Sequence, residues 1–177
     1  MKNLECEERV MITFEQYQAL LAAYMAIDPQ FKILNIENTY LDDEFLSIKK
    51  SGMMLRKRET NGHFELTLKI KREDGEIEIN ETLENHPEID KNLVINYQNC
   101  HPIASLRTNR IEAHEKDYLV VIDQNIYNGI IDYDLEIEAP TLTRAKEAIL
   151  DICKRFNLEY KKGYTSKSSR AFKTRKI

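Results

Sequence analysis

Residues 53–83 read MMLRKRETNGHFELTLKIKREDGEIEINETL, and this stretch decides the fold class. Polar and apolar residues alternate in three successive segments, which is the period of β-strands. The segments are 53–59, 63–72 and 75–83. Turn signals separate them, first Thr60-Asn61-Gly62 and then Asp74-Gly75. The stretch therefore predicts an antiparallel meander of three strands.

The rest of the chain adds strands and helices on both sides of this meander. Further extended segments are expected at 3–12, 31–48, 104–114, 117–126 and 130–138. A capping box at Thr13-Phe14-Glu15-Gln16 opens a helix that ends at Asp28-Pro29, and 143–156 forms an amphipathic helix. A short helix is expected after Pro87, and order in the basic, Ser-rich tail from Lys161 is left open. This order indicates an α+β domain with a mostly antiparallel sheet, and about eight strands suffice to close a barrel.

Composition indicates a single globular domain over residues 1–177. The net charge of -4 is the difference between 26 basic and 30 acidic side chains. This near balance argues against general binding of nucleic acid or of a membrane surface. No apolar run approaches the ~20 residues of a membrane span, and Met1–Glu5 does not begin a signal peptide, so a cytoplasmic location is expected. The cysteine and histidine spacings suggest neither disulfides nor a zinc site.

The polar faces of six strands carry charged residues two positions apart, and hence on one side of each strand. These sets are Glu5/Glu7/Arg9, Arg56/Arg58, Lys69/Lys71, Glu76/Glu78, Arg110/Glu112 and Glu136/Glu138. The alternate residues, such as Leu66/Leu68/Ile70 and Tyr133/Leu135/Ile137, are apolar, and this opposite face is expected to pack on the helices.

A solvated face of a half-exposed sheet is the simpler interpretation of any one charged pair. Like charges about 6.6 Å apart on one strand repel weakly in water and several-fold more where solvent is excluded. Because basic and acidic pairs lie on separate strands, the pattern favours strands that curl around an anionic ligand and its cations. A polyphosphate with Mg²⁺ or Mn²⁺ fits this demand, since Arg and Lys bind phosphate oxygens and carboxylates bind these hard ions.

Several stretches, taken in order, resemble the CYTH superfamily of triphosphate tunnel metalloenzymes. Glu5-Cys6-Glu7-Glu8-Arg9 is similar to the family's N-terminal ExExK signature, with Arg in place of Lys. The other similar stretches are Asn38-Thr39-Tyr40-Leu41-Asp42, Leu55-Arg56-Lys57-Arg58, Leu66-Thr67-Leu68-Lys69 and Asp132-Tyr133-Asp134-Leu135-Glu136-Ile137-Glu138. With Ser166-Lys167-Ser168-Ser169-Arg170 near the C-terminus, the chain most resembles the small CYTH proteins of low-GC Gram-positive bacteria.

This resemblance implies an eight-stranded antiparallel barrel that forms a tunnel, and metal-dependent hydrolysis of inorganic, thiamine or nucleoside triphosphate. It implies metal-binding carboxylates at Glu5, Glu7, Glu136 and Glu138, with Glu78 as a further acid on the tunnel wall. It implies a phosphate clamp of Arg56, Arg58, Lys69, Lys71 and Arg110. Tyr40 and Lys167 are candidates for the tunnel mouth, while Glu76 and Glu112 are left open between tunnel and surface.

Arg9 is the departure from the family pattern, because a guanidinium binds phosphate but does not act as a base. Catalysis is then expected from metal-activated water with Glu5 and Glu7, assisted by Lys69 or Tyr40. A non-catalytic binder of polyphosphate or nucleotide is the main alternative, and an adenylate cyclase ranks below it. The expected partner is a small triphosphate, with no nucleic acid or membrane, and a homodimer is left open.

Overall fold

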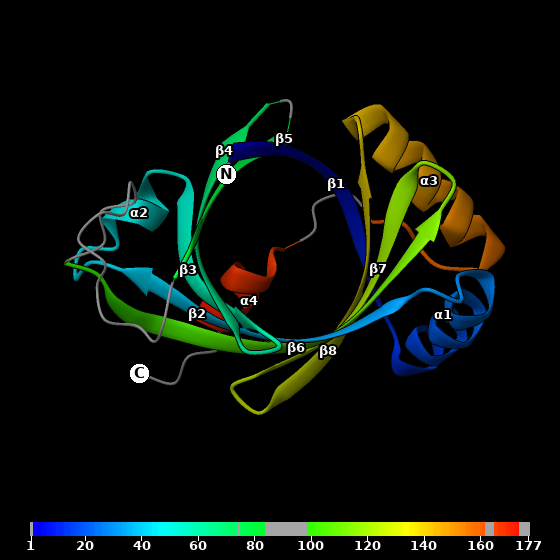
Figure 1. Cartoon of the computed structure of the whole chain (residues 1–177), viewed down its shortest axis with the longest axis horizontal. Helices are drawn as coiled ribbons and strands as arrows, with labels where there is room; N and C mark the ends of the chain where they lie inside the picture. Colours follow the sequence, from blue (N-terminus) through cyan, green and yellow to red (C-terminus); the bar gives the residue numbers. More distant parts are fainter. Residues whose placement is uncertain (1, 74, 84–98, 162–164, 174–177) are drawn as a thin grey trace.

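The computed structural model describes residues 2–73, 75–83, 99–161 and 165–173, with side chains from Cys6 onward. Within these residues the chain forms a closed barrel of eight antiparallel strands (Figure 1). The strands are β1 (Lys2–Ile12), β2 (Lys32–Asp42), β3 (Met53–Thr60), β4 (His63–Arg72), β5 (Gly75–Thr82), β6 (His101–Glu115), β7 (Tyr118–Tyr127) and β8 (Ile130–Ala139). Their order is β1-β5-β4-β3-β2-β6-β7-β8, and β8 pairs with β1 to close the barrel.

The predicted meander is confirmed as β3, β4 and β5, with antiparallel pairing throughout. Its first hairpin turns at Asn61 and Gly62, whose φ angles are 49° and 84°. Asn128 and Gly129 turn the β7–β8 hairpin with φ angles of 49° and 78°. Asn-Gly is favoured at such turns because both central residues adopt positive φ.

Two long helices cover one side of the barrel (Figure 1). α1 (Phe14–Ile27) starts with the predicted capping box between Thr13 and Gln16, and α3 (Leu142–Arg155) follows β8. α3 packs on β1 and β8, and α1 packs on β6, β7 and β8. The main apolar core lies between these helices and strands, with Leu20, Ile137 and Ile149 fully buried. The outward apolar face of β8 therefore packs on helices, as predicted.

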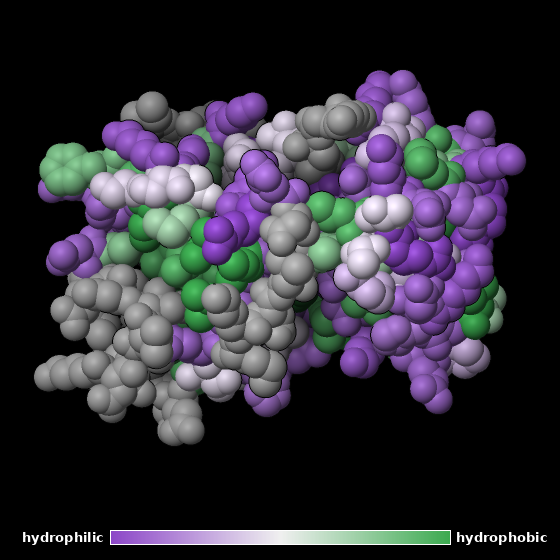
Figure 2. Space-filling model, turned by 90° about the horizontal axis from the view of Figure 1, so that it is seen from above, coloured by the Kyte–Doolittle hydropathy of each residue, from purple (hydrophilic) through white to green (hydrophobic). Residues whose placement is uncertain are grey.

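The outward faces of β3 to β5 form a second, smaller apolar cluster. Leu55 and Leu66 are buried there with Leu68 and Ile79, and Ile48 of the short helix α2 (Ser47–Lys50) packs against them. Seen from above, hydrophobic residues gather in the left half of the molecule, the side of α2, whereas the right half is mostly hydrophilic (Figure 2).

One sequence expectation needs correction. The segment 31–48 is not extended to its end, because β2 stops at Asp42 and α2 begins at Ser47. The carboxylates of Asp42 and Asp43 accept hydrogen bonds from backbone N–H groups of residues 47–49 and fix this turn. The tail from Lys161 contains the helix α4 (Lys167–Lys173). The helix expected after Pro87 lies outside the described residues.

Candidate active site in the barrel

The barrel encloses a cavity of about 420 Å³, lined by seven strands, α2 and α4. The predicted site residues that line it are Glu7, Arg9, Tyr40, Arg56, Arg58, Lys69, Lys71, Glu78, Arg110, Glu136, Glu138 and Lys167. Glu76, left open between tunnel and surface, lines the cavity too. Glu112, which was also left open, is not among the described lining residues. Its Oε1 lies 3.6 Å from Arg110 Nη1. Glu5 belongs to β1, where its backbone pairs with that of Glu76, and its side chain lies outside the described part.

Positive charge exceeds negative charge on the described lining. Eight of the lining side chains are Lys or Arg and six are Asp or Glu. Because most of them point inward from strands at intervals of two residues, the barrel concentrates charges that an open sheet would leave in water. An enclosed cationic excess favours an anionic ligand.

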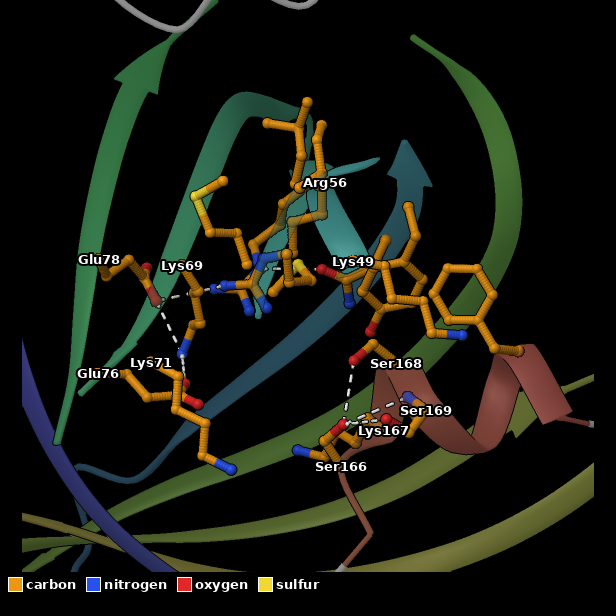
Figure 3. Close-up of a pocket in the computed structure, with 18 of the residues that line it drawn as sticks. Lys49, Arg56, Lys69, Lys71, Glu76, Glu78, Ser166, Lys167, Ser168 and Ser169 are labelled. Atoms are coloured by element: carbon orange, nitrogen blue, oxygen red, sulfur yellow. Dashed lines mark hydrogen bonds and ion pairs between the residues drawn. The ribbon is translucent and has the colours of Figure 1, made fainter. Parts of the chain in front are cut away.

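Arg56, Lys69 and Glu78 form the centre of a wall contributed by β3, β4 and β5 (Figure 3). Lys69 Nζ lies 2.9 Å from Glu78 Oε2, and Arg56 Nη2 lies 3.6 Å from the same oxygen. Although burial opposes ionisation, Arg56 and Lys69 hold the pKa of Glu78 well below its usual range. Arg56 Nε is buried without a hydrogen-bond partner among the described residues. Such an atom carries a desolvation cost that a ligand oxygen would remove.

Arg58 lies on the same face of β3 as Arg56. Its Nε donates a hydrogen bond of 3.2 Å to Asn38 Oδ1 on β2. Burial, together with the positive charges of Arg56 and Arg110, lowers the pKa of Arg58 to about 10. Arg58 is charged at neutral pH, and burial is the largest cause of its lowered pKa, ahead of the neighbouring guanidinium groups.

The acidic side of the cavity belongs to β1 and β8. Glu7 pairs directly with Glu138, and Arg9 pairs with Glu136, in the register of these strands. Arg9 forms ion pairs with both Glu7 and Glu136, and its Nη2 lies 3.3 Å from Glu136 Oε1. Despite burial, Arg9, Lys167 and Arg110 hold the pKa of Glu136 well below its usual range. Glu136 is therefore ionised, and Glu7 and Glu136 both already have a cationic neighbour within the protein.

Asp123 on β7 is a buried site residue that the sequence analysis did not identify. Its carboxylate accepts two hydrogen bonds of 2.9 Å from Arg110, through Nε and Nη2. Lys167 of α4 also pairs with Asp123, and its Nζ lies 3.2 Å from Glu136 Oε2. Asp123 thereby fixes the guanidinium of Arg110 and joins α4 to the barrel. The available signal was the spacing of two between Asp123 and Asn125 in a strand whose first five residues, 118–122, are apolar or aromatic.

Arg170 anchors α4 deeper in the barrel. Its Nη2 and Nη1 lie 2.7 Å and 3.1 Å from the two carboxylate oxygens of Asp134, and its Nε lies 3.1 Å from Asp132 Oδ2. Asn125 donates hydrogen bonds to both aspartates. This buried network fixes the orientation of α4, which presents Lys167 to the cavity.

The cross-strand pair Glu7 and Glu138 is the feature that fits a divalent cation. Like charges directly opposite each other on paired strands destabilise a sheet, and a shared cation relieves that repulsion. Carboxylate oxygens are the ligands that Mg²⁺ and Mn²⁺ prefer. Among the described residues, no three acidic, His or Cys side chains are gathered into a metal-binding group. The described contribution to such a site is therefore this opposed pair of carboxylates.

Barrel closure, inward basic and acidic walls and an enclosed cavity define a class of proteins in which an antiparallel barrel surrounds a charged cavity. The chain belongs to the CYTH domain family, whose model matches residues 3–171. The predicted resemblance is thus confirmed over nearly the whole chain.

Relatives agree with this assignment. The Bacillus subtilis protein named "Putative triphosphatase YjbK" is 24% identical over 170 residues, covering 89% of this chain and 88% of the relative. A crystal structure described as a "putative adenylate cyclase" from Bacillus halodurans has 26% identity, with a TM-score of 0.81 over 97% of this chain and 98% of that one. Both sources fit the predicted similarity to proteins of low-GC Gram-positive bacteria.

A more distant structure supports the fold alone. It is a Hippeastrum protein named "Putative adenylyl cyclase HpAC1", whose description states that it reveals a dominant triphosphatase activity. It shares 17% identity and a TM-score of 0.74, covering 98% of this chain and 96% of that protein.

None of the described helices of the present chain is long and apolar enough to span a membrane.

Proposed function

We propose that this protein hydrolyses a triphosphate inside the barrel with the help of a divalent cation, Mg²⁺ or Mn²⁺. The observation that carries the proposal is the basic wall, where Arg56 Nε is buried without a hydrogen-bond partner in the described part of the chain and Arg58 lies close to other guanidinium groups. The phosphate chain supplies several anionic oxygens to such a wall. The name given to the Bacillus subtilis protein supports the same activity. We also propose that residues 1–177 act as one domain.

The phosphate oxygens would bind Arg56, Arg58, Lys69, Lys71 and Arg110, with Lys167 and Arg9 near the acidic side. Glu7, Glu136 and Glu138 would hold the cation, together with Glu5, and Glu78 keeps Lys69 and Arg56 in place. When bound, the cation lowers the pKa of water and neutralises charge on the phosphate chain.

The proposed reaction is a balanced phosphoryl transfer to water. The water oxygen bonds to the terminal phosphorus as the bond from that phosphorus to its bridging oxygen breaks. A diphosphate and inorganic phosphate are the products, and the proton of the water passes to solvent. The lysine and arginine side chains stabilise the negative charge that develops on the bridging oxygen. Tyr40 and Lys69 remain proposed assistants in orienting the water.

A non-catalytic binder is a second candidate, favoured by one contact. Arg9 pairs with both Glu7 and Glu136, so a fixed cation already contacts two of the carboxylates proposed for the metal. Such a protein would hold a triphosphate without turning it over.

Phosphate release from inorganic, thiamine and nucleoside triphosphates, with Mg²⁺, Mn²⁺ or chelator, tests the proposal. Hydrolysis gives phosphate, and a cyclase gives pyrophosphate and a cyclic nucleotide. Binding without any product identifies the binder. Neither binding nor product from any triphosphate, at any metal concentration, would overturn both candidates.

A further inference from the structure

One corner of the cavity has a different chemistry from the charged walls. Tyr40, Met54, Ile103 and Phe172 line it, and we call these four residues the apolar corner. Tyr40 and Ile103 are buried in one apolar cluster, and Met54 and Phe172 pack against that cluster. The rings of Tyr40 and Phe172 are tilted to each other with centroids 6.2 Å apart. Phosphate oxygens gain nothing from such a surface, whereas a flat organic ring does.

The apolar corner adjoins the basic wall directly. Tyr40 pairs with Arg56 across β2 and β3, and Met54 pairs with Lys69 across β3 and β4. If the phosphates of a ligand contact Arg56 and Lys69, the organic group attached to the phosphate chain therefore lies at the apolar corner. Methionine suits this position because its flexible, polarisable thioether adapts to a flat ring.

The polar groups around the apolar corner are mostly neutral or cationic. Lys49 Nζ lies 4.0 Å from the centroid of the Phe172 ring. Ser168 and Ser169 of α4 also line the cavity (Figure 3). Asp42 is the acidic residue of the lining at this end, and both its carboxylate oxygens accept backbone N–H groups of α2. A cationic ring would meet the ammonium of Lys49 there, while the oxygens of Asp42 are directed to the N–H groups of α2.

We propose, building on the proposed function, that the substrate is a nucleoside triphosphate whose uncharged base and ribose occupy the apolar corner. Lys49, Ser168 and Ser169 would donate hydrogen bonds to the base or ribose, and Met54 and Phe172 would contact the base. Inorganic triphosphate leaves this corner without a ligand, and thiamine triphosphate places a cationic ring beside Lys49. The sequence contains no motif for a base because these residues come from four separate elements, β2, β3, β6 and α4, with Lys49 added by α2.

The test compares kcat/KM for ATP, GTP, CTP and UTP with kcat/KM for inorganic and thiamine triphosphate. Wild type should prefer at least one nucleotide over both other substrates. Met54→Ala and Phe172→Ala should each lower the nucleotide-to-inorganic ratio of kcat/KM by roughly tenfold, the scale of one lost base-stacking contact. Phe45→Ala is the matched aromatic control, because Phe45 is 66% exposed and does not line the cavity. It should leave the ratio unchanged.

The outcomes separate this inference from the proposed function. Hydrolysis of inorganic or thiamine triphosphate in preference to every nucleotide, or an unchanged ratio in both variants, overturns the nucleotide proposal and leaves triphosphate hydrolysis standing. If nothing is hydrolysed, calorimetry measures a ratio of affinities in place of the ratio of kcat/KM. This is the affinity for a β,γ-imido nucleoside triphosphate divided by the affinity for inorganic triphosphate. A nucleotide preference that both variants reduce supports the apolar corner even then, and its absence refutes it.

Discussion

Replacing Arg58 by Met should make the ligand-free protein more stable and its triphosphate complex weaker. The fall in the pKa of Arg58 from its usual 12.5 to about 10 corresponds to roughly 3 kcal/mol of unfavourable free energy for the charged form in the fold. Met retains much of the aliphatic volume and removes the charge, but it leaves Asn38 Oδ1 without its donor, which costs about 1–3 kcal/mol. The net gain in unfolding free energy should be on the order of 1 kcal/mol near neutral pH.

The stability difference between Arg58→Met and wild type should depend on pH, in a direction set by the lowered pKa of Arg58. Because the folded-state pKa is lowered, the unfavourable contribution of Arg58 is fully present below pH 10 and disappears as pH rises through about 10 towards 12.5. The stability advantage of Arg58→Met over wild type should therefore shrink above pH 10. Loss of a charge-assisted hydrogen bond should weaken triphosphate binding by about 1.5–3 kcal/mol, or about 10- to 150-fold in Kd.

Urea denaturation and calorimetric titration with inorganic triphosphate provide the two measurements. Lys57→Met is the matched control, because Lys57 points away from the cavity and its Nζ lies 5.1 Å from the centroid of the Phe64 ring. It should change neither quantity substantially. A ligand-free Arg58→Met protein less stable than wild type, or one that binds triphosphate equally well, would refute the reasoning from clustered guanidinium charge.

Three further predictions concern the acidic side of the cavity. Mg²⁺ or Mn²⁺ should raise the melting temperature of the wild type by relieving repulsion between Glu7 and Glu138, and Glu138→Gln should reduce that increase. A wild-type melting temperature that changes with neither metal nor chelator contradicts the metal proposal. In kinetic assays, Arg9→Ala should mainly raise KM, and Glu136→Gln should mainly lower kcat. If the wild type is inert and Arg9→Lys hydrolyses triphosphate, the natural protein is the non-catalytic binder. Asp123→Asn should lower the unfolding free energy in urea by up to about 3 kcal/mol, since it removes the buried carboxylate that both Arg110 and Lys167 contact and leaves them only their other acidic neighbours. A loss under about 1 kcal/mol would show that the pairing contributes little.

The inward residues of the strands could be predicted because strand geometry is local. A period of two places Arg56 and Arg58 on one face whatever the strand later pairs with, and the same holds for Lys69 and Lys71. Closure of the barrel is different, since it depends on pairing of β1 with β8, residues more than a hundred positions apart. That feature followed from the family resemblance rather than from alternation.

Other features depended on contacts that a local pattern does not contain. Asp123 follows a run of apolar or aromatic residues in β7, and its role follows from Arg110 on the neighbouring strand and Lys167 on α4. The tail helix α4 is short and basic, and its position depends on the pairing of Arg170 with Asp134, 36 residues away. A seven-residue segment is too short to be a stable helix by itself in water. Tertiary contacts therefore determine that α4 forms and where it lies.

The internal ion pairs imply that ligand binding in this barrel is an exchange of partners. In the structure, Glu78 pairs with Lys69 and Arg56, while Arg9 and Lys167 pair with Glu136. A triphosphate that binds the basic wall competes with Glu78, and a cation that binds the acidic side competes with Arg9 and Lys167. When both enter together, each satisfies the group that the other would otherwise leave unpaired in a poorly solvated cavity. Triphosphate and metal should consequently bind with positive coupling, each lowering the Kd of the other by the same factor. Calorimetric titrations with triphosphate at several Mg²⁺ concentrations measure that factor, and equal Kd values with and without Mg²⁺ would exclude the exchange.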